Sequence, residues 1–243
     1  MKVINSEYEK KVNHELSLWQ KKIMQEPSFS SKLAKALQER LNGLVPDKIH
    51  KAITFAIKNM VKAVHTGSGF ITKRLLEECS FEEREKLVKK KLSFYKKAAV
   101  TSGAGTGAAG IFIGLADFPI LLSIKMKFLF DVASIYGYNV KDYKERIFIL
   151  YIFQLAFSSH KKKIELYKII EIWSSYSEQL PNSSENFDWQ SFQQEYRDYI
   201  DLPKMLQLIP GFGAIVGAYA NYQFMEKLAT TAINAYRMRR LKS

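Results

Sequence analysis

The sequence predicts an all-α protein that folds as a single compact multi-helix domain. Apolar residues recur at the 3.6-residue spacing of amphipathic helices along most of the 243 residues, and the alternation typical of strands is nearly absent. Hydrophobic residues make up 47% of the chain and charged residues 25%, a composition that suits a packed core and argues against disorder. We treat residues 1–243 as one domain, in which residues 1–97 form basic amphipathic helices and residues 98–243 form glycine-rich core helices and a basic C-terminal helix.

The basic part contains four expected helices. The first three carry apolar stripes over residues 8–23, 33–44 and 49–64. Pro46 ends the second stripe and opens the third helix, which Gly67 and Gly69 end. The fourth helix follows a capping box made by Ser80 and Glu83 and is strongly basic from Arg84 to Lys97.

The remaining elements are expected to pack around two uncharged runs, residues 98–116 and 205–225. Between and after these runs we expect helices at 119–137, 147–157, 164–177, 189–200 and 222–240, with an exposed loop at 181–187. Together the uncharged runs supply two glycine-rich, closely packed apolar helical segments.

The net charge of +13 is concentrated at the two ends of the sequence. Residues 1–97 carry a net charge of +10, and the last 39 residues carry +4. Such a distribution favours anionic lipid, nucleic acid or an acidic protein as a partner, although any single charge is best explained as part of a solvated surface. Nucleic acid is the weaker prediction, because the lysine runs 89–91 and 161–163 lack the interleaved aromatic residues of single-strand binders.

The expected location is the cytoplasmic face of a membrane, with peripheral association. The first twenty residues lack the apolar stretch of a signal peptide, and the single cysteine, Cys79, fits a reducing compartment. Neither uncharged run is convincing as an ordinary transmembrane helix: the first contains five glycines, and the second contains Gln207, Pro210 and Asn221. They are expected to be core helices or a shallow hairpin entering the bilayer.

The glycines of the uncharged runs allow two interpretations. Gly105, Gly107 and Gly110 match the spacing of the dinucleotide-binding fingerprint, but that site needs a strand before its glycines, and the preceding residues have a helical pattern. We therefore expect no cofactor. Glycines at helical spacing also allow two helix backbones to approach closely. The candidate helix-packing residues are Gly103, Gly107, Gly110, Gly114, Gly211, Gly213 and Gly217.

A candidate polar cluster comprises Asp117, Lys125, Asp131 and Asn221. At 100° per residue, the first three share one face of a helix, where they could form a buried charge cluster that senses a ligand or partner. The interpretation we favour is simpler. Asp117 caps a helix that begins at Phe118–Pro119, while Lys125 and Asp131 reach solvent.

No residue pattern indicates catalysis or metal binding. The histidines, at positions 14, 50, 65 and 160, lack the spacing of metal ligands, and Cys79 has no base near it in the sequence. A Gly-x-Ser-x-Gly elbow and a phosphate-binding loop are also absent from the sequence. We therefore expect a protein that is not an enzyme and that has no metal or cofactor.

Several segments taken together resemble the EcsC family nearly end to end: Gly103–Gly110, Gly114–Pro119, Lys125–Asp131, Lys141–Arg146, Tyr151–Phe157, Gln193–Asp201 and Pro210–Asn221. The resemblance implies a protein encoded beside the ATPase and membrane subunits of an ABC transporter in Gram-positive bacteria, in a system associated with secretion and intramembrane proteolysis. It implies no catalytic mechanism. A looser likeness to a helical module beside some membrane-associated GTPases points to the same location.

The expected function is that of a non-catalytic accessory or regulatory protein, held at the membrane by its basic helices and its glycine-rich hairpin. Its expected partners are anionic lipid and ABC-transporter subunits, and its oligomeric state stays open. Two alternatives remain at this point. One is a helical carrier or sensor of an apolar, lipid-like ligand bound between the two glycine-rich segments, and the other is an enzyme of unrecognised type, with Asp117 as its first candidate residue.

Overall fold

A computed structural model describes residues 6–26, 47–67, 70, 79–106, 111–192, 194 and 214–241. The elements within these ranges are α-helices and one short 3-10 helix, which confirms the prediction of a single all-α domain. In chain order they are α1 (Ser6–Met24), α3 (Asp47–Thr66), α4 (Phe81–Thr106), α5 (Ile111–Tyr136), α6 (Tyr143–Phe157), α7 (His160–Glu171), α8 (Trp173–Glu178), the 3-10 helix η1 (Ser184–Asn186) and α11 (Ala214–Leu241).

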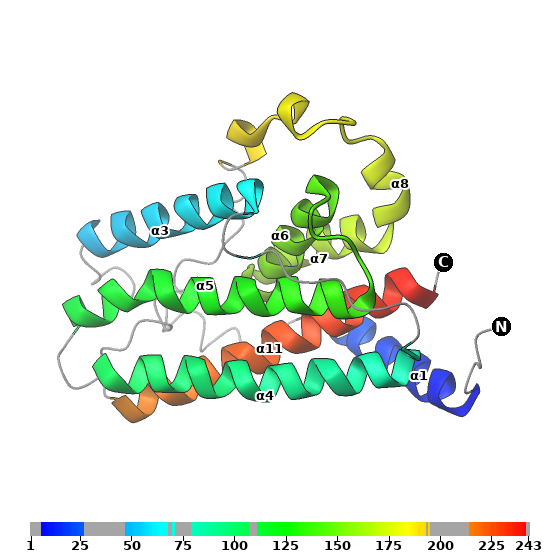
Figure 1. Ribbon diagram of the computed structural model, residues 1–243, viewed down its shortest axis with the longest axis horizontal. Coiled ribbons are helices and arrows are strands. Elements are labelled where there is room, and N and C mark those ends of the chain that lie inside the picture. Colours follow the sequence, from blue (N-terminus) through cyan, green and yellow to red (C-terminus); the bar gives the residue numbers. More distant parts are fainter. Residues whose placement is uncertain are drawn as a thin grey trace.

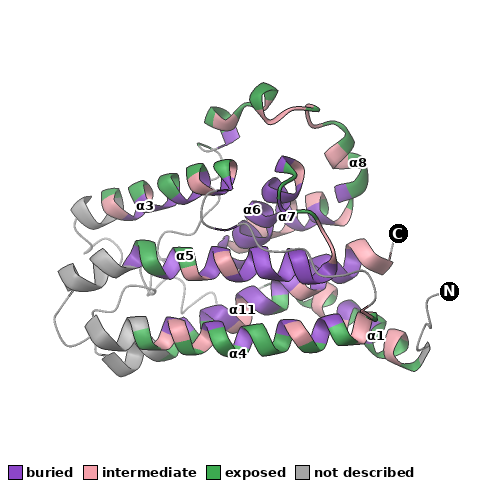
Figure 2. Cartoon of the chain, in the orientation of Figure 1, coloured by how far each residue is buried: buried purple, intermediate pink, exposed green. Residues whose placement is uncertain are grey.

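Three long helices, α4, α5 and α11, form one side of the bundle (Figure 1). The helix α4 packs along both α5 and α11 and runs antiparallel to them, while α3 packs against α5 and α6. Every residue of α6 except Lys144 is buried, as the purple ribbon in Figure 2 shows. A helix that is apolar on all sides belongs in the centre of a domain, so α6 lies inside the bundle, against α7 and α11.

Several helix ends lie where local sequence signals place them. Gly67 follows α3 with a φ angle of +72°, and Gly137 follows α5 with a φ angle of +94°. Glycine adopts this left-handed conformation without steric cost, which makes it the usual residue after a helix. The capping box is also present, because the Ser80 N–H donates to Glu83 Oε2 (2.8 Å) and the Glu83 N–H donates to Ser80 Oγ (3.3 Å).

Other boundaries differ from the sequence-based prediction. The helix expected at 119–137 begins earlier, at Ile111, and keeps Pro119 in its interior. A proline there removes the backbone hydrogen bond to the carbonyl of residue 115, yet α5 continues through it and packs against both α3 and α4. The segment 164–177 is divided into α7 and α8, and the last helix begins at Ala214 rather than 222. The helices predicted at 33–44 and over most of 189–200 lie outside the described residues.

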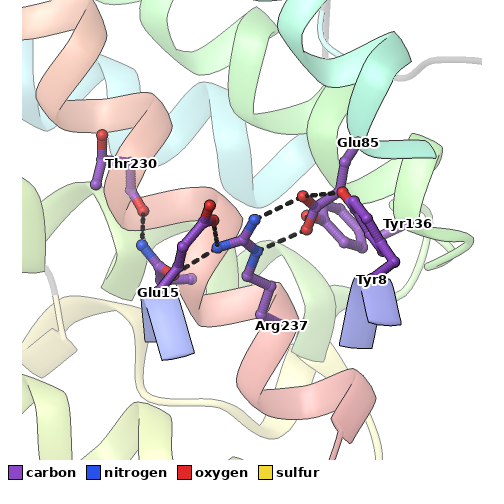
Figure 3. Close-up of polar contacts among 7 residues, drawn as sticks. Tyr8, Glu15, Glu85, Tyr136, Thr230 and Arg237 are labelled. Atoms are coloured by element: carbon purple, nitrogen blue, oxygen red, sulfur yellow. Dashed lines mark hydrogen bonds and ion pairs between the residues drawn. The ribbon is translucent and has the colours of Figure 1, made fainter. Parts of the chain in front are cut away.

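A buried polar cluster centred on Glu85 joins four helices (Figure 3). From α11, Arg237 donates two hydrogen bonds of 2.6 Å, one to each carboxylate oxygen of Glu85. The hydroxyls of Tyr8 on α1 and Tyr136 on α5 also donate to this carboxylate, at 2.7 and 3.1 Å. Glu15 on α1 accepts from the same guanidinium at 2.9 Å. The cluster therefore fixes α1, α4, α5 and α11 relative to one another.

The charges of Glu85 and Arg237 are stabilised by each other and by their hydrogen bonds rather than by water. Only 1% of Glu85 and 5% of Arg237 is exposed. Burial alone would raise the pKa of Glu85, but the hydrogen bonds and positive charge of Arg237 outweigh it and hold the pKa below its usual value. The carboxylate is therefore ionised when the protein is folded at neutral pH.

A second buried ion pair lies at the same end of the bundle. Arg239 Nη1 on α11 donates to Glu145 Oε2 on α6 at 2.7 Å, and the Tyr236 hydroxyl donates to Glu145 Oε1 at 2.6 Å. The Arg239 guanidinium also lies 3.8 Å from the centre of the Tyr138 ring. Burial raises the pKa of Glu145 despite these contacts. The two ion pairs thus gather where α4 and α6 begin and α11 ends.

Substitution of Glu85 by glutamine should reduce the free energy of unfolding by about 3–5 kcal/mol, because it leaves the Arg237 charge buried without its main partner. Urea unfolding at neutral pH measures this loss. The control is Glu82→Gln, which breaks an ion pair between Glu82 and the exposed Lys86 one turn along the same helix. It should change stability little, because water screens exposed pairs of this kind. Equal effects of the two substitutions would contradict the central role of Glu85.

Candidate membrane-contact surface

The outer face of α4 is basic. Between positions 86 and 97 this helix carries six lysines and no acidic residue. Its apolar residues Val88, Leu92, Tyr95 and Ala99 are buried in the core. They recur every three or four residues and so form one buried face of α4, whereas all six lysines except Lys96 are exposed. The basic stretch of the sequence is thus an exposed surface on one helix.

Three of the six lysines are neutralised by acidic side chains. Lys86 pairs with Glu82 at 2.8 Å, Lys91 pairs with Asp131 at 2.9 Å, and Lys96 pairs with Glu226 on α11. Across the described part of the chain, the remaining lysines, Lys89, Lys90 and Lys97, form no ion pair, and all three are exposed. These three ammonium groups give the surface its uncompensated positive charge.

A groove of about 630 Å³ runs along the junction of α4 and α11 and is lined by residues of both helices. Its basic wall consists of Lys89, Lys96 and Lys97. Its apolar lining comes from both helices: Leu92, Val100, Ala229 and Ile233. The groove therefore combines positive charge with an apolar floor.

The described parts of the two uncharged runs meet at one end of the bundle. There α4 ends at Thr106, α5 begins at Ile111 and α11 begins at Ala214 (Figure 1). We call this part of the molecule the uncharged end and define it as residues 98–106, 111–116 and 214–221. It lies opposite the end that holds the two buried ion pairs. The bundle thus has a polar, cross-linked end and, opposite it, the uncharged ends of α4, α5 and α11.

Large apolar and aromatic side chains are exposed in or next to the uncharged end. Tyr219 on α11 is 64% exposed and Tyr222 is 42% exposed, and Ile120 on α5 is 52% exposed. Phe94, on the basic face of α4, is 63% exposed. Exposed tyrosines and aliphatic residues beside lysines are characteristic of surfaces that contact the membrane interface.

The candidate polar cluster is divided between two places. The Lys125 ammonium donates a hydrogen bond of 3.2 Å to Asn221 Oδ1, and neither residue is exposed. Asp131 faces α4 instead, where its carboxylate accepts from Tyr95 (2.9 Å) and pairs with Lys91 (2.9 Å). The structure thus brings Lys125 and Asn221 together across α5 and α11, but it does not bring Asp131 to them.

The favoured interpretation of this cluster is wrong in two respects. Asp117 cannot cap a helix that begins at Phe118–Pro119, because α5 already begins at Ile111. Lys125 and Asp131 do not reach solvent, since they are 0% and 6% exposed. The physical reason is the same in both cases: α5 extends about two turns further than the proline indicated, and it is covered by α3, α4 and α11.

The candidate helix-packing glycines are only partly placed. Gly103 lies in α4, Gly114 in α5 and Gly217 in α11, all in segments of the uncharged end. The other four, Gly107, Gly110, Gly211 and Gly213, lie outside the described residues. Close helix packing through these glycines stays a prediction.

Sequence comparison identifies the family of this protein. A profile of the EcsC protein family matches residues 10–241. The chain belongs to the EcsC family. It is 45% identical to Protein EcsC of Bacillus subtilis (strain 168) over 225 residues, which are 92% of each chain. It is 29% identical to the uncharacterized protein YdbA of the same organism, covering 93% of this chain and 90% of YdbA. No solved structure matches it.

Sequence reasoning missed the groove of this EcsC-family protein. The spacing of Lys89, Ser93 and Lys97 at successive helical turns was visible in the sequence. The opposite wall, which includes Thr230, comes from a helix more than one hundred residues later, and no local pattern links the two. None of the described helices, moreover, is long and apolar enough to cross a bilayer.

Substitution of the buried Lys125 by methionine should stabilise this EcsC-family protein at neutral pH. Burial lowers the pKa of Lys125 from 10.5 to about 7. Between these values the unfolded chain binds a proton that the folded chain lacks, so stability should rise with pH by up to about 1.4 kcal/mol per pH unit. Lys125→Met should remove this rise, whereas Lys90→Met at an exposed position should keep it. The free energy of unfolding of each variant is measured with urea between pH 7 and about 10. The same dependence on pH in both variants would contradict a lowered pKa for Lys125.

Proposed function

We propose that this EcsC-family protein is a non-catalytic accessory protein that binds peripherally to the cytoplasmic face of the membrane and acts with an ABC transporter. The observation that carries the membrane part is the convergence of both uncharged runs at one end of the bundle, next to the basic face of α4. Apolar segments partition into the bilayer interface, and lysines beside them are attracted to anionic headgroups.

The proposed orientation places the uncharged end toward the bilayer. Lys96 and Lys97 then lie at the level of the headgroups, and Tyr219 and Tyr222 lie at the interface, where the aromatic ring and the hydroxyl of tyrosine are both accommodated. The end that contains Glu85 and Arg237 faces the cytoplasm. In this arrangement the buried ion pairs stay within protein, far from the lipid.

The depth of insertion is limited by the position of Asp117. From Lys97 to Thr106, α4 rises by about 14 Å, which is roughly half the thickness of the hydrocarbon core. Insertion over this full length would also take Asp117 into the membrane, because it lies only six residues after the start of α5. A carboxylate deep in the bilayer costs about 3 kcal/mol or more. We therefore propose contact with the interface rather than deep insertion.

Membrane binding should require apolar and aromatic side chains in the uncharged end (Tyr219) and next to it (Ile120). The variants Ile120→Asp and Tyr219→Asp should each strongly reduce flotation with vesicles that contain anionic phosphatidylglycerol. Binding of the unmodified protein should also weaken as salt rises to about 0.5 M, because the Debye length falls from about 10 Å at 0.1 M to about 3 Å at 1 M.

The matched control is Ile172→Asp, which introduces the same charge at a residue that is 54% exposed. Ile172 lies at the junction of α7 and α8, away from the uncharged end (Figure 1). This variant should float like the unmodified protein. Equal loss in all three variants, or equal binding to neutral and anionic vesicles at every salt concentration, would overturn the proposed orientation and its electrostatic basis.

The transporter part rests on membership of the EcsC family. A tagged chain isolated from gently solubilised cells should co-purify with an ATPase subunit and a membrane subunit of an ABC transporter. The Ile120→Asp variant should recover less of both subunits, because membrane binding precedes assembly in this proposal. Isolation of the tagged chain without either subunit, under conditions that keep the transporter intact, would refute the association.

A further inference from the structure

The groove between α4 and α11 has a polar centre within its apolar lining. Ser93 on α4 and Thr230 on α11 both line it, and both residues are exposed. Lys89 and Lys97 lie four residues before and after Ser93, about 6 Å away along the helix axis in each direction. Two flexible ammonium groups can therefore approach an anion at Ser93 from both sides, while hydroxyls on either wall can donate hydrogen bonds to it.

Lys96 has a different role, because its charge is already compensated. It pairs with Glu226 across the groove, and its ammonium group lies 4.2 Å from the centre of the Tyr222 ring. Only 14% of its side chain is exposed. The contact ties α4 to α11 at one end of the groove and neutralises Glu226, the one acidic residue among those described as lining it. The charge that remains in the groove is that of Lys89 and Lys97.

The apolar floor limits the chemistry of the occupant. Leu92 and Ala229 form a buried base below the polar centre, and Val100 and Ile233 are half-buried in its walls. A small inorganic anion would use the lysines and hydroxyls but would leave the half-buried side chains of Val100 and Ile233 in contact with water. An occupant that contacts both parts carries an anionic group attached to a hydrocarbon segment.

We propose that this groove binds one anionic phospholipid, with its phosphodiester at Ser93 and Thr230, between Lys89 and Lys97, and the start of its acyl chains over Leu92 and Ala229. The proposal rests on the proposed membrane function and adds a specific lipid site to it. Charge complementarity supports a lipid, because the groove has two uncompensated lysines and lies beside the uncharged end, where headgroups would be nearest.

Dihexanoyl phosphatidylglycerol, titrated as a monomer into the full-length protein by calorimetry, should bind with a stoichiometry of one. Lys89→Gln should weaken binding about tenfold, because it removes a hydrogen bond to a charged group. Thr230→Val and Ser93→Ala, which leave the net charge unchanged, should each weaken it severalfold. Thermal melts establish that each variant is folded.

The matched control is Lys90→Gln. Lys90 is the neighbour of Lys89, is likewise exposed and unpaired among the described residues, and lies outside the groove, beside Phe94 in a second hollow between α4 and α5. Its substitution changes the net charge identically and should alter affinity less than twofold. Equal weakening by Lys89→Gln and Lys90→Gln, without any effect of Thr230→Val, would show diffuse electrostatic attraction and overturn the groove as the site.

Two further arms separate the possible failures. Glycerophosphoglycerol carries the same phosphodiester without acyl chains, and it should bind much more weakly than the lipid. Equal affinity would identify a soluble phosphate ester as the occupant and refute the lipid assignment. Flotation with vesicles tests the membrane function separately. If the protein floats but does not bind the short-chain lipid, the lipid site in the groove is disproved and membrane binding is not. If it binds the lipid but does not float, membrane binding is disproved and the lipid site is not.

Discussion

The ionised carboxylate of Glu85 is the constraint on which the arrangement of the bundle depends. A buried charge is strongly unfavourable unless its hydrogen-bonding capacity is satisfied, and Glu85 accepts from Arg237, Tyr8 and Tyr136 at the same time. These donors come from α11, α1 and α5. Their geometry leaves little freedom for any of the four helices to slide, so the register of α4 against α5 and α11 is set at this end of the molecule.

That register explains how two uncharged segments, far apart in sequence, reach the same place. Because α4 runs antiparallel to both α5 and α11, the end of α4 must lie beside the starts of the other two. Lys96 then meets Glu226 and Tyr222, and Lys125 meets Asn221. The apolar end and the groove beside it thus follow from an ion pair at the opposite end of the same helices.

The sequence predicted much of the helical framework but little of the site. Periodicity and end signals such as Ser80, Glu83 and Gly67 act locally, so the capping box and the end of α3 were foreseen correctly. Pro119 misled the prediction, because tertiary packing outweighed its effect on the helix. The partners Glu85 and Arg237 are 152 residues apart, and Asp131 turned toward Lys91 rather than Lys125. Pairings of this kind depend on how helices are oriented around the core, which periodicity alone does not specify.

The separation of Glu85 and Arg237 also determines when the fold can be completed during synthesis. Domains begin to fold from their N-terminal part as the chain emerges, but Glu85 receives its bidentate partner only once α11 has been made. Until then, α1, α4 and α5 can collapse around a carboxylate that has two tyrosine hydroxyls and no bidentate cationic partner. The packing around Glu85 is therefore completed only when the last helix has been made, although the contacts of α4 with α5 and of α6 with α7 can form earlier.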